Sequence, residues 1–252
     1  MSKGKIIVDG MEILPQEKIE DLQCSDLRII QSEDTFRFGF DAVFLADFAS
    51  VRLGDLILDL GCGNGVIPLL LAGKQKPGMI WGLEIQEKPA AMAQKSVTMN
   101  KLDGKIKIVQ GDIRTPPEEL KPGSFDLVVS NPPYLQAEKK INATQEIAVA
   151  RHEILCSLSD VNKTAARMLR YKGKFALIHR PGRLPEIFRQ LENNKLTPKR
   201  IRFIHPNLGK KATMVMVEAV KGGKSHLITE KPLIIYNDKG EYTDEIISIY
   251  QG

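Results

Sequence analysis

From residue 56 onward the sequence alternates short apolar runs with longer amphipathic stretches, and this alternation limits the fold more than any other feature. Such a pattern is typical of βα units that build a mostly parallel sheet, whose strands are apolar because helices cover both faces. We expect strands at residues 56–59, 79–84, 106–110, 125–130 and 175–179. We expect helices at residues 66–74, 89–100 and 160–171, the last opened by Asp160 and ended at Gly173. The pattern therefore predicts an α/β fold.

The later part of this region changes its pattern. Residues 184–192 are expected to form another helix, and residues 200–204 and 213–220 are expected to form two further strands. A short connection allows two such strands to pair antiparallel, whereas a parallel pair needs a long crossover. We therefore expect an antiparallel pair at the end of the sheet.

The two ends of the chain differ from this middle part. Residues 27–31 are strand-like and residues 41–49 are amphipathic, so we interpret residues 1–50 as an N-terminal cap segment. Residues 51–222 are expected to form the main domain. Residues 223–252 are irregular in pattern and are interpreted as a C-terminal tail.

Cysteine usage and hydropathy exclude several classes of protein. Cys24, Cys62 and Cys156 are far apart, odd in number and form no CxxC pair, which argues against a disulfide framework and a thiolate metal site. The first ten residues lack the apolar core of a signal peptide, and apolar runs such as residues 66–72 are too short to span a membrane. We expect a cytoplasmic protein with no membrane partner and no metal.

The positive charge is concentrated in one segment. Residues 160–224 contain 16 Lys and Arg against 4 Asp and Glu, a net charge of +12, while the rest of the chain carries −7. This asymmetry favours a surface that binds a polyanion such as a nucleic acid. Solvated lysines along helix faces explain the same charge equally well, so charge alone leaves both interpretations open.

The first chemical motif is Asp59-Leu60-Gly61-Cys62-Gly63-Asn64-Gly65, which follows an expected strand and precedes an expected helix. Glycines in such a loop permit positive φ and a close approach of the backbone to a ligand. Dinucleotide-binding loops space their glycines as G-x-G-x-x-G around a pyrophosphate. The spacing here is G-x-G-x-G, with an acid directly before it. It favours a ligand that has no pyrophosphate.

Three acidic residues stand at the carboxyl ends of three successive expected strands. Asp59 precedes the glycine loop, Glu84 ends the next strand and can accept hydrogen bonds from both ribose hydroxyls, and Asp112 follows the third strand. In an open α/β sheet, ligands bind in the crevice outside the carboxyl ends of the strands. Each acid alone could be a surface residue or a helix cap, but together they predict a nucleoside site, with Asp112 positioned to accept from an adenine amine.

The second motif is Asn131-Pro132-Pro133-Tyr134, directly after the strand expected at residues 125–130. Two prolines can simply end a strand. At this position, however, the Asn131 amide oxygen and the Pro132 carbonyl can accept both hydrogens of an NH₂ group, and Tyr134 can stack on a planar acceptor. We predict that these four residues are catalytic and hold a poorly nucleophilic amine in line with the methyl group of a sulfonium.

Together these motifs resemble the class I S-adenosylmethionine-dependent methyltransferases that carry an Asn-Pro-Pro-Tyr motif. The resemblance implies a Rossmann-like, mostly parallel seven-stranded sheet with an antiparallel last strand and helices on both faces. It also implies S-adenosyl-L-methionine as the cofactor. The cofactor-binding residues that it implies are Phe38, Asp41, Asp59, Gly61, Gly63, Asn64, Glu84, Ile85, Asp112, Ile113 and Asn131.

A wider set of residues is similar to the bacterial tRNA adenine-N6 methyltransferases that act beside the anticodon of a valine tRNA. The similarity covers roughly residues 21–236 and rests on Gln31 and on segments 36–39, 41–43, 150–153, 205–206 and 209–212. Phe40 and Leu135 depart from the family pattern. The resemblance implies a tRNA partner, and phosphate contacts are then expected from Lys199, Arg200, Arg202, Lys210 and Lys211.

Other functions remain alternatives at this stage. Release-factor methyltransferases share the Asn-Pro-Pro-Tyr motif and modify a protein glutamine amide, but they carry a larger N-terminal domain than the cap expected here. A non-catalytic RNA-binding protein on the same fold is a further alternative, and a nicotinamide oxidoreductase is the least favoured. We interpret His152 as part of a loop-fixing ion-pair cluster and Cys62 as a small filler. The oligomeric state is not predicted.

Overall fold

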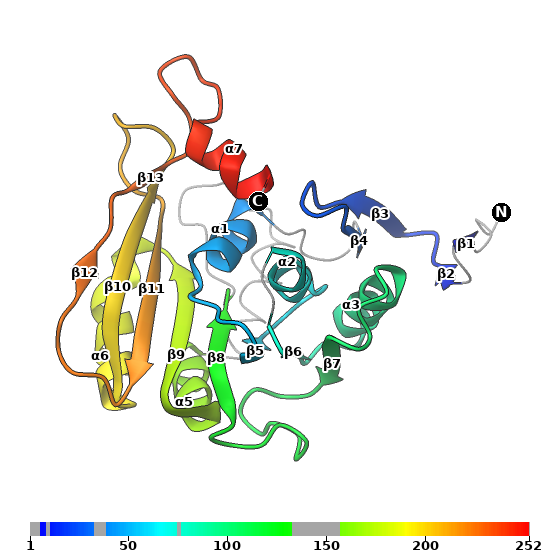
Figure 1. The fold of residues 1–252 in the computed structure, drawn as a ribbon, viewed down its shortest axis with the longest axis horizontal. Coiled ribbons are helices and arrows are strands. Elements are labelled where there is room, and N and C mark those ends of the chain that lie inside the picture. The colour runs from blue at the N-terminus through cyan, green and yellow to red at the C-terminus, as the bar shows by residue number, and fades with distance from the viewer. Residues whose placement is uncertain (1–5, 9–10, 33–38, 75–76, 133–156, 252) are drawn as a thin grey trace, which may run out of the picture.

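The computed structural model describes residues 6–8, 11–32, 39–74, 77–132 and 157–251. Its main strands are β5 (Leu56–Leu60), β6 (Met79–Glu84), β7 (Ile106–Gln110), β8 (Phe125–Ser130), β9 (Leu169–His179), β10 (Leu196–His205), β11 (Met214–Lys221), β12 (Ile228–Thr229) and β13 (Leu233–Ile234). They form one sheet in the order β12-β10-β11-β9-β8-β5-β6-β7, in which β13 also pairs with β10 (Figure 1). Strands β7, β6, β5, β8 and β9 are parallel, and β11 runs antiparallel to β9 and β10. The expected α/β fold with a late antiparallel strand is confirmed, but among the described residues the sheet has nine strands rather than seven, because β12 and β13 pair with β10 after the antiparallel strand β11.

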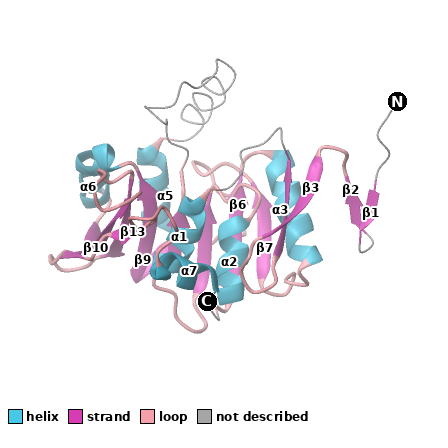
Figure 2. Ribbon diagram, turned by 90° about the horizontal axis from the view of Figure 1, so that it is seen from above, coloured by secondary structure: helices cyan, strands magenta, loops and turns pink. Residues whose placement is uncertain are grey.

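Helices cover the sheet on both faces (Figures 1 and 2). Along β5, Ile57 belongs to one buried apolar cluster, whereas Leu58 and Leu60 belong to another, because successive side chains of a strand point to opposite faces. The first cluster contains residues of α1 (Phe40–Phe48), α2 (Val66–Lys74) and α3 (Glu87–Met99), and the second contains residues of α5 (Leu158–Met168) and α6 (Leu184–Asn193). Burial on both faces explains the continuous apolar runs in the sequence.

The boundary between α5 and β9 differs from the expected one. Ser157 Oγ accepts the Asp160 N–H at 3.2 Å and Asp160 Oδ2 accepts the Ser157 N–H at 3.0 Å, which is a capping box. Asp160 therefore lies in the first turn rather than at the start of the helix. Strand β9 begins at Leu169, where we expected helix, because an irregularity in its pairing with β8 accommodates Lys172 at φ 64°.

The N-terminal segment contains two antiparallel hairpins. Strands β1 (Ile6–Val8) and β2 (Met11–Ile13) form the first, and β3 (Glu17–Asp21) and β4 (Arg28–Ser32) form the second. Polar side chains of α3 and its C-cap pair with the free edge of β4, since Ser96 Oγ accepts the Ile30 N–H at 2.9 Å and Asn100 bonds both the N–H and the carbonyl of Arg28. These bonds satisfy backbone groups that an open edge strand would expose.

The segment after residue 222 is more regular than expected. It contains β12, β13 and α7 (Asp244–Gln251), and α7 lies beside α1 (Figure 1). Ile246 and Ile249 of α7 are buried in the same cluster as α1, and Lys74 Nζ donates to the Ile249 carbonyl. A two-residue strand and a one-sided apolar helix of eight residues leave little trace in the sequence, which explains why the pattern indicated a tail.

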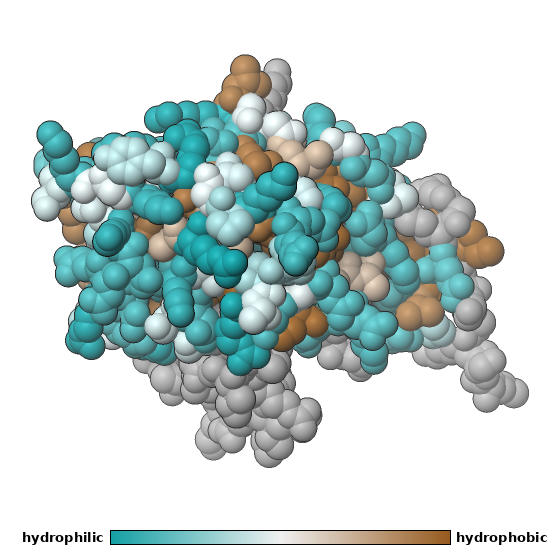
Figure 3. Space-filling view, turned by 90° about the horizontal axis from the view of Figure 1, so that it is seen from below, coloured by the Kyte–Doolittle hydropathy of each residue, from teal (hydrophilic) through white to brown (hydrophobic). Residues whose placement is uncertain are grey.

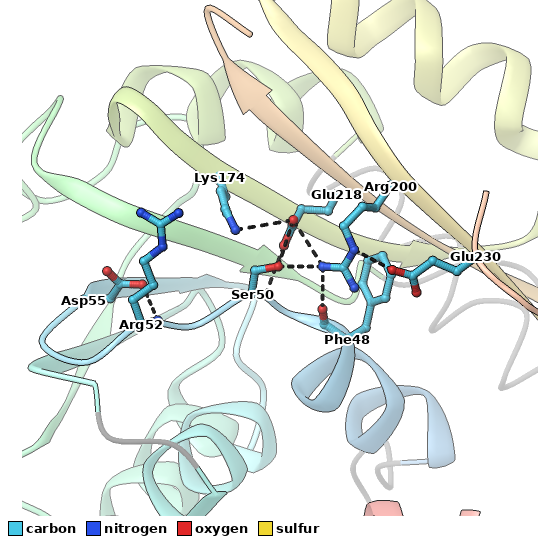
Figure 4. A network of polar contacts seen from close by, with 8 residues as sticks. All are labelled: Phe48, Ser50, Arg52, Asp55, Lys174, Arg200, Glu218 and Glu230. Carbon is cyan, nitrogen blue, oxygen red and sulfur yellow. Dashed lines mark hydrogen bonds and ion pairs between the residues drawn. The ribbon is translucent and has the colours of Figure 1, made fainter. Parts of the chain in front are cut away.

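A buried network of polar groups joins α1 to the end of the sheet (Figure 4). The Glu218 carboxylate in β11 is 2% exposed and accepts from the Ser50 N–H at 3.0 Å and the Ser50 hydroxyl at 2.9 Å. Arg200 Nη1 in β10 lies 3.3 Å from Glu218 Oε1, and Arg200 Nε donates to Glu230 at 2.7 Å. The Arg200 guanidinium also lies 4.4 Å from the ring centroid of Phe48. The network thus connects four separate segments of the chain.

The outer surface is mainly polar. On the face drawn in Figure 3, hydrophilic side chains cover most of the area and apolar ones gather only in small separate places. Within the described ranges, every helix is too short or too polar to cross a membrane.

Candidate active site

Backbone hydrogen bonds to β6 hold the glycine loop that follows β5. The N–H groups of Gly61 and Cys62 donate to the Leu83 carbonyl at 2.8 and 3.1 Å, and the Gly65 N–H donates to the Cys62 carbonyl at 2.9 Å. Gly61, Gly63 and Gly65 have φ values of 76°, 55° and 85°, which L side chains rarely adopt. The loop therefore has one fixed conformation that requires its glycines.

The glycines of this loop have different surroundings. A Cβ at Gly65 would lie 3.0 Å from the Cβ of Ala93, so Gly65 allows α3 to approach closely. A Cβ at Gly63 would meet nothing within 4 Å, and one at Gly61 would meet only Ile113 Cδ1, at 3.9 Å. The side of the loop at Gly61 and Gly63 is therefore open to a ligand.

Asp59 is a fully buried carboxylate without a hydrogen-bond partner among the described residues. It is the last residue but one of β5, its exposed fraction is 0%, and neither Oδ1 nor Oδ2 accepts a hydrogen bond there. Burial, and then the nearby charge of Glu84, raise the pKa of Asp59 well above its ordinary value. An unpartnered buried carboxylate is costly, so this position is suited to a cationic or hydrogen-bond-donating ligand group.

Glu84, at the end of β6, is held in a fixed orientation. Its Oε2 accepts the Gly63 N–H at 2.9 Å and its Oε1 accepts the Gln86 N–H at 2.9 Å, and the residue is 5% exposed. Each carboxylate oxygen can accept a further hydrogen bond. Glu84 therefore presents two oriented acceptors next to the glycine loop, as a pair of ribose hydroxyls requires.

Asp112 follows β7 and is paired with Arg114. Arg114 Nε lies 3.0 Å from both carboxylate oxygens, and Nη2 donates to Oδ2 at 2.5 Å. These hydrogen bonds lower the pKa of Asp112. The neighbouring Ile113 is nearly buried, and its carbonyl accepts the Thr164 hydroxyl at 2.8 Å. An adenine amine at Asp112 would share the carboxylate with Arg114.

The N-terminal cap contacts the glycine loop through polar side chains. Asn64 Nδ2 donates to Gln31 Oε1 at 3.4 Å, and Gln31 Nε2 donates to Glu20 at 2.8 Å. Asn64 and Gln31 are both buried. Asp41 is buried in the first turn of α1, and Phe38 lies outside the described residues. The N-terminal cap therefore contacts the glycine loop through Gln31 of β4.

Aromatic residues that sequence reasoning missed surround the first turn of α1. Tyr242 and Tyr250 make edge contacts with Phe40 at 5.9 and 6.3 Å between ring centroids, and Tyr236 stacks on Tyr242. Burial raises the pKa of Tyr250, and Asp41 contributes to this shift through its charge. Because these tyrosines are about two hundred residues from α1, no local pattern could have identified them.

Asn131 and Pro132 follow the end of β8, next to the glycine loop. Ser130 is fully buried, and its hydroxyl donates to the Leu60 carbonyl at 2.8 Å, which joins the end of β8 to the end of β5. Asn131 is half-buried and Pro132 is buried, whereas residues 133–156, including Pro133, Tyr134 and His152, lie outside the described residues. The amide of Asn131 therefore lies at the edge from which the glycine loop emerges.

The strand order brings these residues to one edge. Strands β7, β6, β5 and β8 are neighbours and parallel, so their carboxyl ends lie side by side. Asp112, Glu84, Asp59 and Asn131 each stand at or just beyond one of these ends. The three acids and the amide expected from the sequence thus lie at the carboxyl edge of four neighbouring strands.

Three of the basic residues expected to contact phosphate have partners within the protein. Lys199 Nζ donates to the Lys224 carbonyl at 3.2 Å, and Arg200 belongs to the network of Figure 4. The Arg202 side chain is 14% exposed and pairs with Glu245 at 2.5 Å. These contacts favour structural roles for Arg200 and Arg202.

Lys210 and Lys211 lie in a different environment. Both are exposed, in the loop between β10 and β11. Strand β10 is parallel to β9 and β8, since it is antiparallel to β11, which is antiparallel to β9. This loop therefore leaves the same edge of the sheet as Asn131, whereas Lys199 lies toward the opposite edge.

The environments of Cys62 and His179 favour structural rather than catalytic roles. Burial, followed by the charges of Asp59 and Glu84, raises the pKa of the Cys62 thiol well above its ordinary value, so Cys62 stays a neutral filler. Burial lowers the pKa of His179 to about 4, so its imidazole is neutral at physiological pH. Within the described part of the chain, no group of three His, Cys, Asp or Glu side chains could hold a metal ion.

Comparisons with known sequences find related proteins. A family model described as the methyltransferase small domain matches residues 37–194. A tRNA1(Val) (adenine(37)-N6)-methyltransferase of Pedobacter heparinus is 29% identical over 217 residues, which cover 86% of this chain and 90% of that protein. One of the same name from Bacteroides thetaiotaomicron is 32% identical over 143 residues, which cover 56% of this chain and 59% of that protein.

Solved structures share the fold. A predicted O-methyltransferase from Agrobacterium tumefaciens matches with a TM-score of 0.68 and 23% identity, covering 83% of this chain and 95% of that one. A geranyl diphosphate methyltransferase in complex with S-adenosylmethionine matches with a TM-score of 0.52 and 14% identity, covering 71% and 84%.

Proposed function

We propose that this chain, which belongs to the methyltransferase small domain family and uses S-adenosyl-L-methionine as its methyl donor, methylates the N6 amine of an adenine in tRNA. The observation that carries the proposal is the position of Asn131. It follows β8 at the edge where the glycine loop leaves β5, and the Ser130 hydroxyl joins the two strand ends. An amide oxygen at this place can orient an amine toward a donor held by the loop.

The residues of the crevice fit the parts of the cofactor. When bound, S-adenosyl-L-methionine supplies an electrophilic methyl group on a sulfonium. Asp59, buried without a partner, would accept from the ammonium of its methionine end. Glu84 would accept from the ribose hydroxyls, and Asp112 from the adenine amine. The open side of Gly61 and Gly63 allows the ligand to lie against the backbone.

Asn131 and Pro132 act on the acceptor. The exocyclic amine of adenine is a weak nucleophile because its lone pair is delocalised into the ring. When the Asn131 side-chain oxygen and the Pro132 carbonyl accept its two hydrogens, the nitrogen is held with its lone pair directed at the methyl group. These acceptors stabilise the positive charge that develops on the amine, which afterwards loses a proton to solvent. The step therefore requires no strong general base from the protein.

The choice of tRNA as acceptor is supported by two observations. Relatives that align with most of this chain are named tRNA1(Val) (adenine(37)-N6)-methyltransferases. Lys210 and Lys211 are exposed at the edge of the sheet that carries Asn131, where phosphates near a target base would lie. A tRNA acceptor is also consistent with the cytoplasmic location expected from the sequence.

The test is incubation of the purified protein and isotope-labelled S-adenosyl-L-methionine with either unmodified tRNA transcripts or a release factor, followed by mass spectrometry of the nucleosides or peptides. We expect label in N6-methyladenosine with the parent protein, and label that accumulates about 10²-fold more slowly with Asn131→Ala. Label on a glutamine of a release factor, with unmodified tRNA, would overturn the acceptor and support the protein-methylating alternative. Absence of label in both would overturn the catalytic proposal.

A further inference from the structure

The C-terminal segment (residues 223–251) and the loop between β10 and β11 (residues 206–213) form one surface. This surface lies at the edge of the sheet that carries Asn131. The Ile235 N–H donates to the His205 carbonyl at 2.9 Å and the Tyr236 N–H to the Pro206 carbonyl at 2.8 Å. His205 Nδ1 lies 2.8 Å from the Lys210 carbonyl, which fixes the far side of the loop. The loop therefore has a defined position on the protein, although Lys210 and its neighbour Lys211 are exposed.

A hollow of about 490 Å³ lies between these two segments. Tyr236 lines it, and Tyr242, which is not part of the lining, stacks on the Tyr236 ring with centroids 5.3 Å apart and an interplanar angle of 18°. A planar group placed in the hollow would lie beside Tyr236. The remaining lining residues are Asn207, Gly209, Asn237, Asp238 and Gly240.

The hollow is close enough to the catalytic crevice to hold part of the same nucleic acid. Three strand intervals separate β8, which precedes Asn131, from β10, which precedes the loop. With about 4.8 Å between neighbouring strands, this is roughly 14 Å along the edge. A few nucleotides of single-stranded RNA span such a distance.

The chemistry of the surface favours a nucleobase with an exocyclic amine. The ring of Tyr236 offers a stacking face, and the Asp238 carboxylate accepts hydrogen bonds, as carboxylates do from the amino group of cytosine. The same carboxylate repels phosphate, whereas Lys210 and Lys211 on the neighbouring loop attract it. The surface thus separates a base-binding hollow from a phosphate-binding loop.

We propose that this surface binds single-stranded RNA beside the target adenine, with one base stacked on Tyr236 in the hollow and adjacent phosphates on Lys210 and Lys211. The inference rests on the proposed function and adds the place where the RNA is held. It assigns a substrate-binding role to the C-terminal segment.

The first experiment measures the affinity of an unmodified tRNA transcript by fluorescence anisotropy. Tyr236→Ala is expected to raise the Kd roughly 5- to 100-fold, the range for loss of a stacked base, while Tyr236→Phe keeps most of the affinity. Tyr171→Ala is the matched control, because Tyr171 is 67% exposed but lies in the first part of β9, toward the opposite edge. Thermal melting and cofactor titration confirm that each variant is folded.

The second experiment uses side chains that can be removed without affecting the fold. Replacing Lys210 and Lys211 together by alanine is expected to reduce the slope of log affinity against log salt by about two. The control replaces Lys195 and Lys224, which are exposed toward the other edge, and should leave the slope unchanged.

The two proposals fail in different ways. A parent protein that methylates adenine in tRNA, with Kd and salt slope unchanged in both sets of variants, would overturn the RNA-binding surface and leave the proposed function intact. That result would also be expected if the hollow binds a protein. A parent protein that neither binds nor methylates tRNA would overturn the proposed function itself, and the surface with it.

Discussion

Replacing Arg200 by alanine should destabilise the protein without changing its affinity for RNA. Arg200 interacts with Glu218, Glu230 and the Ser50 hydroxyl, and it lies over the Phe48 ring (Figure 4). The sequence alone assigned Arg200 to phosphate binding. Its partners within the protein instead predict a loss of stability, since a buried carboxylate would lose its main cation.

The size of this loss of stability depends on the partners that the Glu218 carboxylate retains when Arg200 is removed. Removing one partner of a fully buried ion pair costs about 3–5 kcal/mol, whereas an exposed pair contributes about 1 kcal/mol or less. Glu218 is 2% exposed but retains both hydrogen bonds from Ser50 and has Lys174 Nζ at 3.7 Å. We therefore expect Arg200→Ala to reduce the free energy of unfolding by about 2–3 kcal/mol. For a chain of this size that corresponds to a decrease in Tm of about 5–10 °C.

Thermal melting and urea titration measure this effect. Arg200→Lys keeps the charge but cannot donate to Glu218, Glu230 and Ser50 together, so an intermediate loss is expected. The neighbouring Lys199→Ala is the control and should change the free energy of unfolding by no more than about 0.5 kcal/mol. If Arg200→Ala melts within about 1 °C of the parent protein while its KM for tRNA rises, the reasoning is wrong and Arg200 contacts phosphate.

Three further predictions concern the crevice. Glu84→Ala should weaken S-adenosyl-L-methionine binding by about 1–3 kcal/mol in calorimetry, because the ribose hydroxyls lose their acceptor; an unchanged Kd would contradict the ribose assignment. Asn131→Ala should leave cofactor affinity unchanged and lower kcat on tRNA by about 10²-fold in single-turnover assays, and a variant as fast as the parent would show that the segment only ends a strand. Cofactor affinity should increase as the pH rises through the raised pKa of Asp59, because binding of an ammonium favours the ionised carboxylate. Asp59→Asn should remove this pH dependence in titrations across the acidic and neutral range, and a parent protein without it would contradict the assignment.

The strands, and the edge of the sheet at which the candidate site lies, could be predicted because burial on both faces produces continuous apolar runs. The expected strands at residues 79–84, 106–110 and 125–130 coincide with β6, β7 and β8. Residues that follow such runs must lie at the carboxyl edge of a parallel sheet. This rule alone places Glu84 and Asn131 at the same edge of the sheet.

The basic segment could not be interpreted in the same way. Its net charge is a sum along the chain, whereas phosphate binding depends on which edge each side chain reaches. Lys199 lies in the first part of β10 and Lys210 lies beyond its end, so the two side chains are at opposite edges of the sheet. Arg200 donates a hydrogen bond to Ser50, which is 150 residues away in the sequence. Contacts of such separation arise only when the whole sheet is assembled. The tyrosines of the C-terminal segment are hidden from sequence reasoning for the same reason.

The unpartnered carboxylate of Asp59 connects stability to binding. Its pKa is raised above the ordinary value of 3.8 in the folded protein, so between these two values the folded state holds a proton that the unfolded state has released. The free energy of unfolding of the cofactor-free protein therefore falls as the pH rises through that window. A cationic ligand favours the ionised form and offsets this loss. Glu84, by contrast, already accepts hydrogen bonds from the Gly63 and Gln86 N–H groups. Its burial therefore reduces the stability of the cofactor-free protein only a little. An internal partner for Asp59 would stabilise the free protein, but the ligand would then have to displace that partner, and the gain on binding would be smaller.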